Sequence, residues 1–173
     1  PTHGTSSAAS DVYKRQALNK TREEILINLD KIVKENKISI FERYLYRRSK
    51  NEPIAYILEE KEFWSKKFKV NSDTLIPRPE TDLLVDESLK WDNGKNISIL
   101  DIGTGSGCII ISLLNYLKRS LGTGIDISPK AISIARQNAQ MYKLCNRVKF
   151  YNKKIENIFD KKFDLIVSNP PYI

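Results

Sequence analysis

The stretch Asp101-Ile-Gly-Thr-Gly-Ser-Gly107 decides the fold. It places three glycines directly after the expected strand 97–102 and at the start of a helical pattern over 106–118. Glycine allows positive φ angles, and it lets the backbone approach a ligand without a Cβ atom in between. A strand that leads through such a loop into a helix predicts a ligand-binding strand–helix unit.

Strand and helix patterns alternate along the rest of the chain. The expected strands are 97–102, 123–127, 147–152 and 163–168, and the expected helices are 106–118 and 129–142. Ser128 and Pro129 are suited to the cap and the first position of the second helix. This alternation predicts an α/β fold with a parallel sheet, doubly wound by the usual handedness rule.

The residues before this sheet predict two smaller parts. Thr21–Glu24 and Ser39–Glu42 have the capping-box pattern, which predicts two helices within a partial helical domain, 17–51. Residues 52–80 combine aromatic and β-branched residues, typical of a β-hairpin, with a proline-rich connector. Thr81 is expected to cap a helix over 82–91, where the domain that contains the parallel sheet, 81–173, would begin.

Residues 1–16 do not follow a helical or strand period, and they contain no initiator methionine. We expect them to be a vector or adaptor segment outside the native protein.

Composition excludes several classes of protein. Two cysteines and one histidine among 173 residues are too few for a disulfide framework or a zinc cluster, so no metal is expected. No apolar run is long enough to span a membrane, and we expect a cytoplasmic protein. The net charge is +8, and its basic excess lies in 97–173. That excess is compatible with nucleic-acid binding or with an ordinary solvated surface.

The glycine loop favours one class of cofactor. Its G-x-G-x-G spacing differs from the dinucleotide pattern G-x-G-x-x-G, and there is no Gly-Lys-Ser/Thr sequence for a triphosphate. Asp126 ends the next strand, where a carboxylate can accept both ribose hydroxyls. The pattern therefore predicts S-adenosylmethionine, against the alternative of a tight turn and a surface aspartate. The expected cofactor residues are Gly103, Thr104, Gly105, Ser106, Gly107, Asp126 and Asn169.

Asn169-Pro-Pro-Tyr172 follows the fourth expected strand and suits methyl transfer to an sp² nitrogen. The Asn169 side chain and the Pro170 carbonyl can accept the two N–H bonds of an amide or base amine. Tyr172 offers a flat face for stacking, and Pro171 stiffens the turn. We therefore expect Asn169, Pro170 and Tyr172 to be catalytic, and all four residues to bind substrate. The alternative is a Pro-Pro turn that only ends a strand.

Several segments together resemble the HemK/PrmC family of peptide chain release factor glutamine methyltransferases. These are Glu52–Leu58, Glu62–Trp64, Leu75–Thr81, Asp101–Cys108 and Phe163–Ile173. The resemblance implies a Rossmann-like class I core, here with its first four strands. It also implies N5-methylation of the glutamine in the Gly-Gly-Gln loop of class 1 release factors, with S-adenosylmethionine as donor.

The chain also departs from the family pattern. Glu59 stands where the family has glycine, and Lys153-Lys154 replaces the usual Ser-Asp. We expect a chain truncated at both ends, inactive and poorly stable by itself, from a protein that is a monomer. The alternative function is methylation of an exocyclic amine in rRNA or DNA, and a third is a non-catalytic module that binds S-adenosylmethionine.

Overall fold

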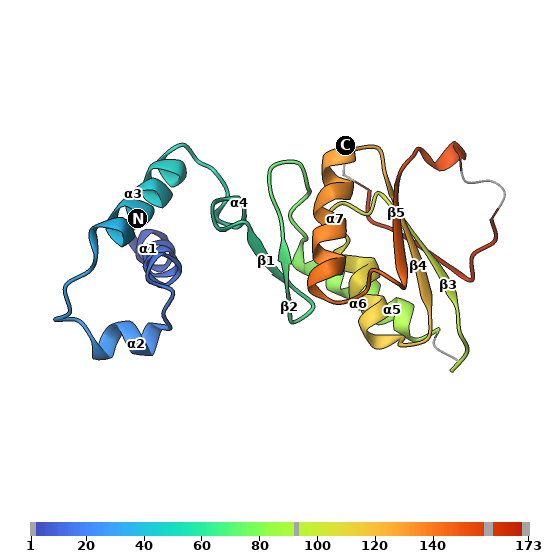
Figure 1. Cartoon of the computed structure of the whole chain (residues 1–173), viewed down its shortest axis with the longest axis horizontal. Helices are drawn as coiled ribbons and strands as arrows, with labels where there is room; N and C mark the ends of the chain where they lie inside the picture. The colour runs from blue at the N-terminus through green and yellow to red at the C-terminus, as the bar shows by residue number, and fades with distance from the viewer. Residues whose placement is uncertain (1–2, 92–93, 158–160, 171–173) are drawn as a thin grey trace. The chain divides into compact units, whose positions relative to one another are not determined.

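The computed structural model describes residues 3–91, 94–157 and 161–170. It divides the chain into two compact units, Pro1–Glu59 and Glu60–Ile173. Figure 1 labels the elements of each unit.

The first unit is helical. Its elements are α1 (His3–Leu18), α2 (Arg22–Ile27), α3 (Glu35–Ser49) and α4 (Ile54–Leu58). α2 begins at the predicted capping box, because the Thr21 hydroxyl accepts the Glu24 N–H at 3.2 Å and the Glu24 carboxylate accepts the Thr21 N–H at 2.7 Å. The prediction of a helix at this point is confirmed.

The structure differs from the sequence prediction at three places in this unit. Most of 1–16 lies in α1, whose Tyr13 and Ala17, four residues apart, are both buried. The burial of these two side chains stabilises a helix although the segment has only a weak helical period. That residues 1–16 come from a vector or adaptor stays a prediction. Ser39 lies inside α3 and donates to the Glu35 carbonyl at 3.2 Å, so it is not a cap. Residues 54–58, expected to be extended, form α4.

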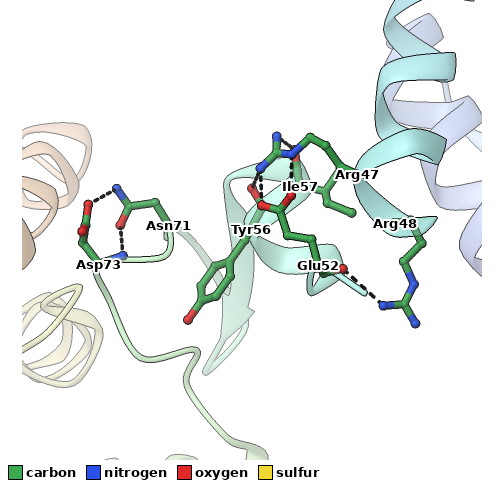
Figure 2. A network of polar contacts seen from close by, with 7 residues as sticks. All are labelled: Arg47, Arg48, Glu52, Tyr56, Ile57, Asn71 and Asp73. Carbon is green, nitrogen blue, oxygen red and sulfur yellow. Dashed lines mark hydrogen bonds and ion pairs between the residues drawn. The ribbon is translucent and has the colours of Figure 1, made fainter. Parts of the chain in front are cut away.

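Arg47 joins the end of α3 to α4. Its guanidinium donates to both carboxylate oxygens of Glu52, at 2.8 and 2.5 Å, and to the carbonyls of Tyr56 and Ile57 (Figure 2). The fork-like guanidinium thus satisfies carbonyls of a short helix while its charge is paired. The same ion pair lowers the pKa of Glu52, chiefly through this hydrogen bond.

The second unit begins with the predicted hairpin. β1 (Glu60–Phe63) and β2 (Lys66–Lys69) pair antiparallel, with Trp64 and Ser65 as a two-residue turn. Both turn residues have positive φ, 46° and 55°, as the tight hairpin turn that matches strand twist requires. The predicted hairpin is confirmed. Its strands cover only a small part of the predicted segment 52–80, and they belong to the same compact unit as the sheet that follows.

The main sheet contains β3 (Ser98–Ile102), β4 (Leu121–Asp126), β5 (Val148–Asn152) and β6 (Leu165–Ser168). Its spatial order is β5-β4-β3-β6, and all neighbouring strands are parallel. This confirms the predicted α/β fold. The strand order changes direction between β3 and β6, and ligands of such sheets bind outside the strand ends at that point.

Three helices pack beside the sheet in Figure 1: α5 (Asp82–Leu89), α6 (Cys108–Tyr116) and α7 (Pro129–Met141). α6 contacts β3 and β4, and α7 contacts β4, β5 and the hairpin strand β2. α6 supplies more of the core than any other helix or strand of this unit, through consecutive buried residues from Cys108 to Leu114. α7 starts at the predicted cap, where the Ser128 hydroxyl accepts the Ala131 N–H at 3.2 Å.

Candidate methyl-transfer site

The glycine loop lies at the carboxyl end of β3. Gly103, Gly105 and Gly107 have φ angles of 69°, 53° and 77°, which favour glycine. A Cβ atom at Gly103 would meet nothing within 4 Å, and one at Gly105 would reach only a carbonyl at 3.9 Å. At Gly107 it would meet Ile111 at 3.1 Å. The first two glycines therefore leave space for a ligand, whereas the third allows close packing.

Neighbouring strand ends hold the loop in place. The Thr104 N–H donates to the Ile125 carbonyl of β4 at 2.9 Å, and its hydroxyl donates to the Asp101 carboxylate at 2.7 Å. The side chains of Thr104 and Ser106 are almost fully buried. Any contact of these two residues with a ligand would consequently come from their backbone.

Asp126, predicted to bind ribose, lies beside the loop. One carboxylate oxygen accepts the Gly105 N–H and the other accepts the Ser128 N–H, each at 2.9 Å. Each oxygen retains another lone pair that can accept a hydroxyl. The structure thus brings together two parts of the predicted cofactor site that are 21 residues apart in the sequence.

Asn169 directly follows β6. The parallel register pairs Ile102 with Ser168, so the residues that follow, Gly103 and Asn169, leave adjacent strands at the same edge. Asn169 is half-buried, and its Nδ2 donates to the Thr81 hydroxyl at 3.1 Å. Pro170 is exposed, while Pro171 and Tyr172 lie outside the described residues.

Thr81 has a different role from the predicted one. Its hydroxyl makes no capping bond at the start of α5, and its backbone is already helical at the end of a short 3₁₀ turn, Pro79–Thr81. A pocket of about 170 Å³ lies beside it, lined by Arg78, Glu80, Thr81, Leu84 and Asn169. Sequence reasoning missed the contact with Asn169 because the two residues are 88 positions apart.

Asp101 and Cys108 are buried below the loop. Desolvation raises the pKa of Asp101 to about 6, against the opposing effect of the Thr104 hydrogen bond. Burial raises the pKa of the Cys108 thiol to about 12, so the thiol stays protonated and is not a nucleophile. Within the described residues, no group of three potential ligands is placed to hold a metal ion.

The strand end that carries Lys153 is held by Asp126. The carbonyl of Asp126 accepts the Asn152 side-chain amide at 2.9 Å and the Lys153 N–H at 3.1 Å. Lys153 and Lys154 themselves are exposed. A hollow of about 570 Å³ along α7 and β5 is lined by none of the predicted site residues.

Comparison with protein families gives two matches. Residues 3–58 match the PrmC N-terminal domain, and residues 93–171 match a methyltransferase domain. The first match includes residues 3–16, which are most of the segment that the sequence predicts to be a vector or adaptor.

Curated relatives agree with these domains. The release factor glutamine methyltransferase of Vibrio cholerae is 42% identical over 173 residues, 98% of this chain and 60% of the relative. That of Buchnera aphidicola subsp. Acyrthosiphon pisum is 41% identical over 157 residues, 90% of this chain and 56% of the relative. A bifunctional methyltransferase of Rickettsia felis is 40% identical over 98% of this chain and 38% of its own length. The chain therefore spans less than two thirds of these relatives.

Solved structures share the fold. A precorrin 8w decarboxylase from Methanobacterium thermoautotrophicum is 26% identical, with a TM-score of 0.50 over 58% of this chain and 54% of that one. The human methyltransferase 10 domain containing protein is 20% identical, with a TM-score of 0.51 over 61% of this chain and 54% of that one. These likenesses confirm the predicted Rossmann-like core. The match to a methyltransferase domain agrees with S-adenosylmethionine as cofactor. In the described residues, no helix is both long and apolar enough to cross a membrane.

Proposed function

We propose that this chain, which belongs to the HemK/PrmC family, methylates the glutamine side-chain amide in the Gly-Gly-Gln loop of class 1 release factors. S-adenosylmethionine would supply an electrophilic methyl group and leave as S-adenosylhomocysteine, while the methylated amide nitrogen would release one proton to water. The proposal places the protein in the cytoplasm, as a monomer. The observation that carries it is the position of Asn169, beside the glycine loop and with its Nδ2 bound to Thr81.

The glycine loop and Asp126 form a fitting cradle for the cofactor. Gly103 and Gly105 leave open space where side chains would otherwise project. Asp126 is fixed by two backbone N–H groups, so its carboxylate can accept ribose hydroxyls without first being ordered. Gly107 supports the cradle through packing on α6.

Asn169 orients the substrate amide. Because its Nδ2 is engaged by Thr81, its Oδ1 is the end of the side chain that remains for a substrate N–H. An amide nitrogen is a weak nucleophile because its lone pair is delocalised. An acceptor that holds its N–H in place contributes through orientation, which in favourable systems is worth about 7–11 kcal/mol. The Pro170 carbonyl is the proposed acceptor for the second N–H, and the predicted stacking of Tyr172 would complete the site.

Methyl transfer to labelled substrates tests this function. The protein in its complete reading frame is incubated with labelled donor and with release factor, rRNA or DNA. We expect label in the release factor, at the glutamine. Label only in nucleic acid would instead establish the alternative function, which the basic residues of 97–173 motivate.

Two substitutions at Thr81 test how Asn169 is held. Thr81→Val keeps the shape but removes the hydroxyl, and loss of a hydrogen bond worth about 1 kcal/mol predicts a roughly fivefold lower kcat. Thr81→Ser keeps the hydroxyl and is the matched control, with a kcat near that of the wild type. Equal rates for Val and Ser would show that this hydrogen bond does not matter.

Asn169→Ala separates the enzyme from a non-catalytic binding module. Losing this acceptor predicts a decrease in rate of about 5- to 150-fold, while the donor stays bound through the glycine loop and Asp126, with at most the part of its affinity that Asn169 contributes being lost. A protein that binds the donor but transfers no methyl group to any of the three substrates would contradict the proposed function.

A further inference from the structure

Asn138 is a fully buried polar residue on α7, outside the cofactor and substrate sets described above. Its exposed fraction is 0%, and it lies on the same apolar helix face as Ala131, Ala135 and Ala139. A buried amide is costly unless it is hydrogen-bonded, so its partners indicate its role.

The Asn138 side chain bonds to the outer edge of the hairpin. Its Oδ1 accepts the Lys69 N–H at 2.8 Å, and its Nδ2 donates to the Lys69 carbonyl at 3.0 Å. The amide thereby takes the place of a neighbouring strand for the last residue of β2. This pair of bonds fixes the position of β2 against α7.

The same side chain also reaches the glycine loop. Nδ2 donates its other hydrogen to the carbonyl of Ser106 at 2.8 Å. Ser106 stands between Gly105 and Gly107, both with positive φ, where the backbone has few steric constraints of its own. Asp126 holds the loop at the Gly105 N–H, and Asn138 holds it one residue later.

Gln137 of α7 and Tyr142, which directly follows the helix, contact the hairpin without a second bond to the loop. The Tyr142 hydroxyl donates to the Lys67 carbonyl at 2.7 Å, and the Tyr142 ring lies against Phe68, 5.3 Å between ring centres. Gln137 accepts a bond from the Lys69 ammonium at 3.3 Å. Tyr142 therefore provides a comparison that separates hairpin docking from loop geometry.

We propose that Asn138 is a positioning residue that couples the hairpin to the cofactor loop. By holding the Ser106 carbonyl and the Lys69 main chain at once, it fixes the peptide groups beside Gly105 and Gly107 in the arrangement that receives the cofactor. Cofactor binding and hairpin order then favour each other. This inference rests on the proposed cofactor site.

The test measures binding of S-adenosylhomocysteine by calorimetry. We expect Asn138→Ala to weaken binding at least tenfold, because the Ser106 peptide loses its partner. Tyr142→Phe removes one bond between the C-terminal end of α7 and the hairpin but leaves Ser106 untouched, so its affinity should stay within twofold of the wild type.

Equal affinity of Asn138→Ala and the wild type would overturn the coupling. Equal weakening by Asn138→Ala and Tyr142→Phe would also overturn it, since hairpin docking alone would then explain the effect. A wild-type chain that does not bind the probe would instead overturn the proposed cofactor site.

Hydrogen exchange of the wild type tests the coupling without a variant that must fold. S-adenosylhomocysteine should slow exchange of the Lys69 amide by a larger factor than that of the Thr74 amide, which bonds to Asn71 within a turn of the same unit. Equal protection of the two amides would contradict the coupling.

Discussion

Glu59 has a left-handed backbone conformation that costs free energy for any residue with a Cβ atom. It ends α4 with φ 55° and ψ 24°, as expected for a position where the family has glycine. Glu59→Gly should remove a strain of about 1 kcal/mol, partly offset by the greater freedom of glycine in the unfolded chain. We expect the free energy of unfolding to rise by about 0.5 kcal/mol in a urea titration.

Glu59→Ala is the control for this change. It removes the same carboxylate, whose charge acts on Arg47, but keeps a Cβ atom at positive φ. Its stability should not exceed that of the wild type. A gain as large as that of Glu59→Gly would mean that charge, not backbone strain, governs this position.

Asp101 makes stability depend on pH. It is fully buried, and one of its oxygens has no hydrogen-bond partner among the described residues. Desolvation raises its folded pKa to about 6, whereas the pKa of an unfolded aspartate is about 4. The folded state thus binds more protons between these values, so this contribution is fully present below about pH 4 and is lost as pH rises through about 6.

Asp101→Asn isolates this contribution. The difference of about two pKa units corresponds to about 3 kcal/mol of stability. The wild type loses this free energy of unfolding between pH 4 and pH 8, whereas the variant, whose amide does not titrate, keeps it. The stability of the variant relative to the wild type should therefore increase with pH across that range. Parallel pH profiles in urea titrations would contradict the shifted pKa.

At the scale of elements, local chemistry was predictable and long-range contacts were not. The caps at Thr21 and Ser128 were recognised because each bonds within its own helix. Ser39 and Thr81 were also predicted to be helix caps. Instead, the Ser39 hydroxyl donates to the Glu35 carbonyl of its own helix, and the Thr81 hydroxyl accepts a bond from Asn169. A sequence pattern cannot distinguish these partners, since the choice depends on packing.

In the candidate site, too, local features were predictable and long-range contacts were not. The glycine loop and Asp126 were predicted because both lie at the carboxyl ends of parallel strands, which meet at one edge of the sheet. Asn138 was missed because its role requires the hairpin and the loop to meet at α7. A polar residue among the alanines of an apolar helix face was the available signal.

Gly124 allows β4 to pass close to the glycine loop. A Cβ atom there would lie 2.6 Å from the Phe150 ring and 2.9 Å from the Thr104 hydroxyl. Gly124→Ala must displace one of them, and overpacking of a core strand typically costs about 1–3 kcal/mol. We expect a lower free energy of unfolding in a urea titration and weaker cofactor binding in calorimetry. Wild-type stability would show that the core adapts without strain.

At the scale of the whole molecule, the two compact units should respond differently to cofactor. Both tryptophans, Trp64 and Trp91, belong to Glu60–Ile173, so their fluorescence reports that unit. Far-ultraviolet circular dichroism also reports α1–α4 of the other unit. At 100 times its dissociation constant, S-adenosylhomocysteine should stabilise the tryptophan-containing unit by about 2.7 kcal/mol. We therefore expect the fluorescence transition to move to a higher urea concentration, while part of the dichroism change occurs at the same urea concentration as without cofactor. Coincident transitions that move together would mean that the two units unfold as one.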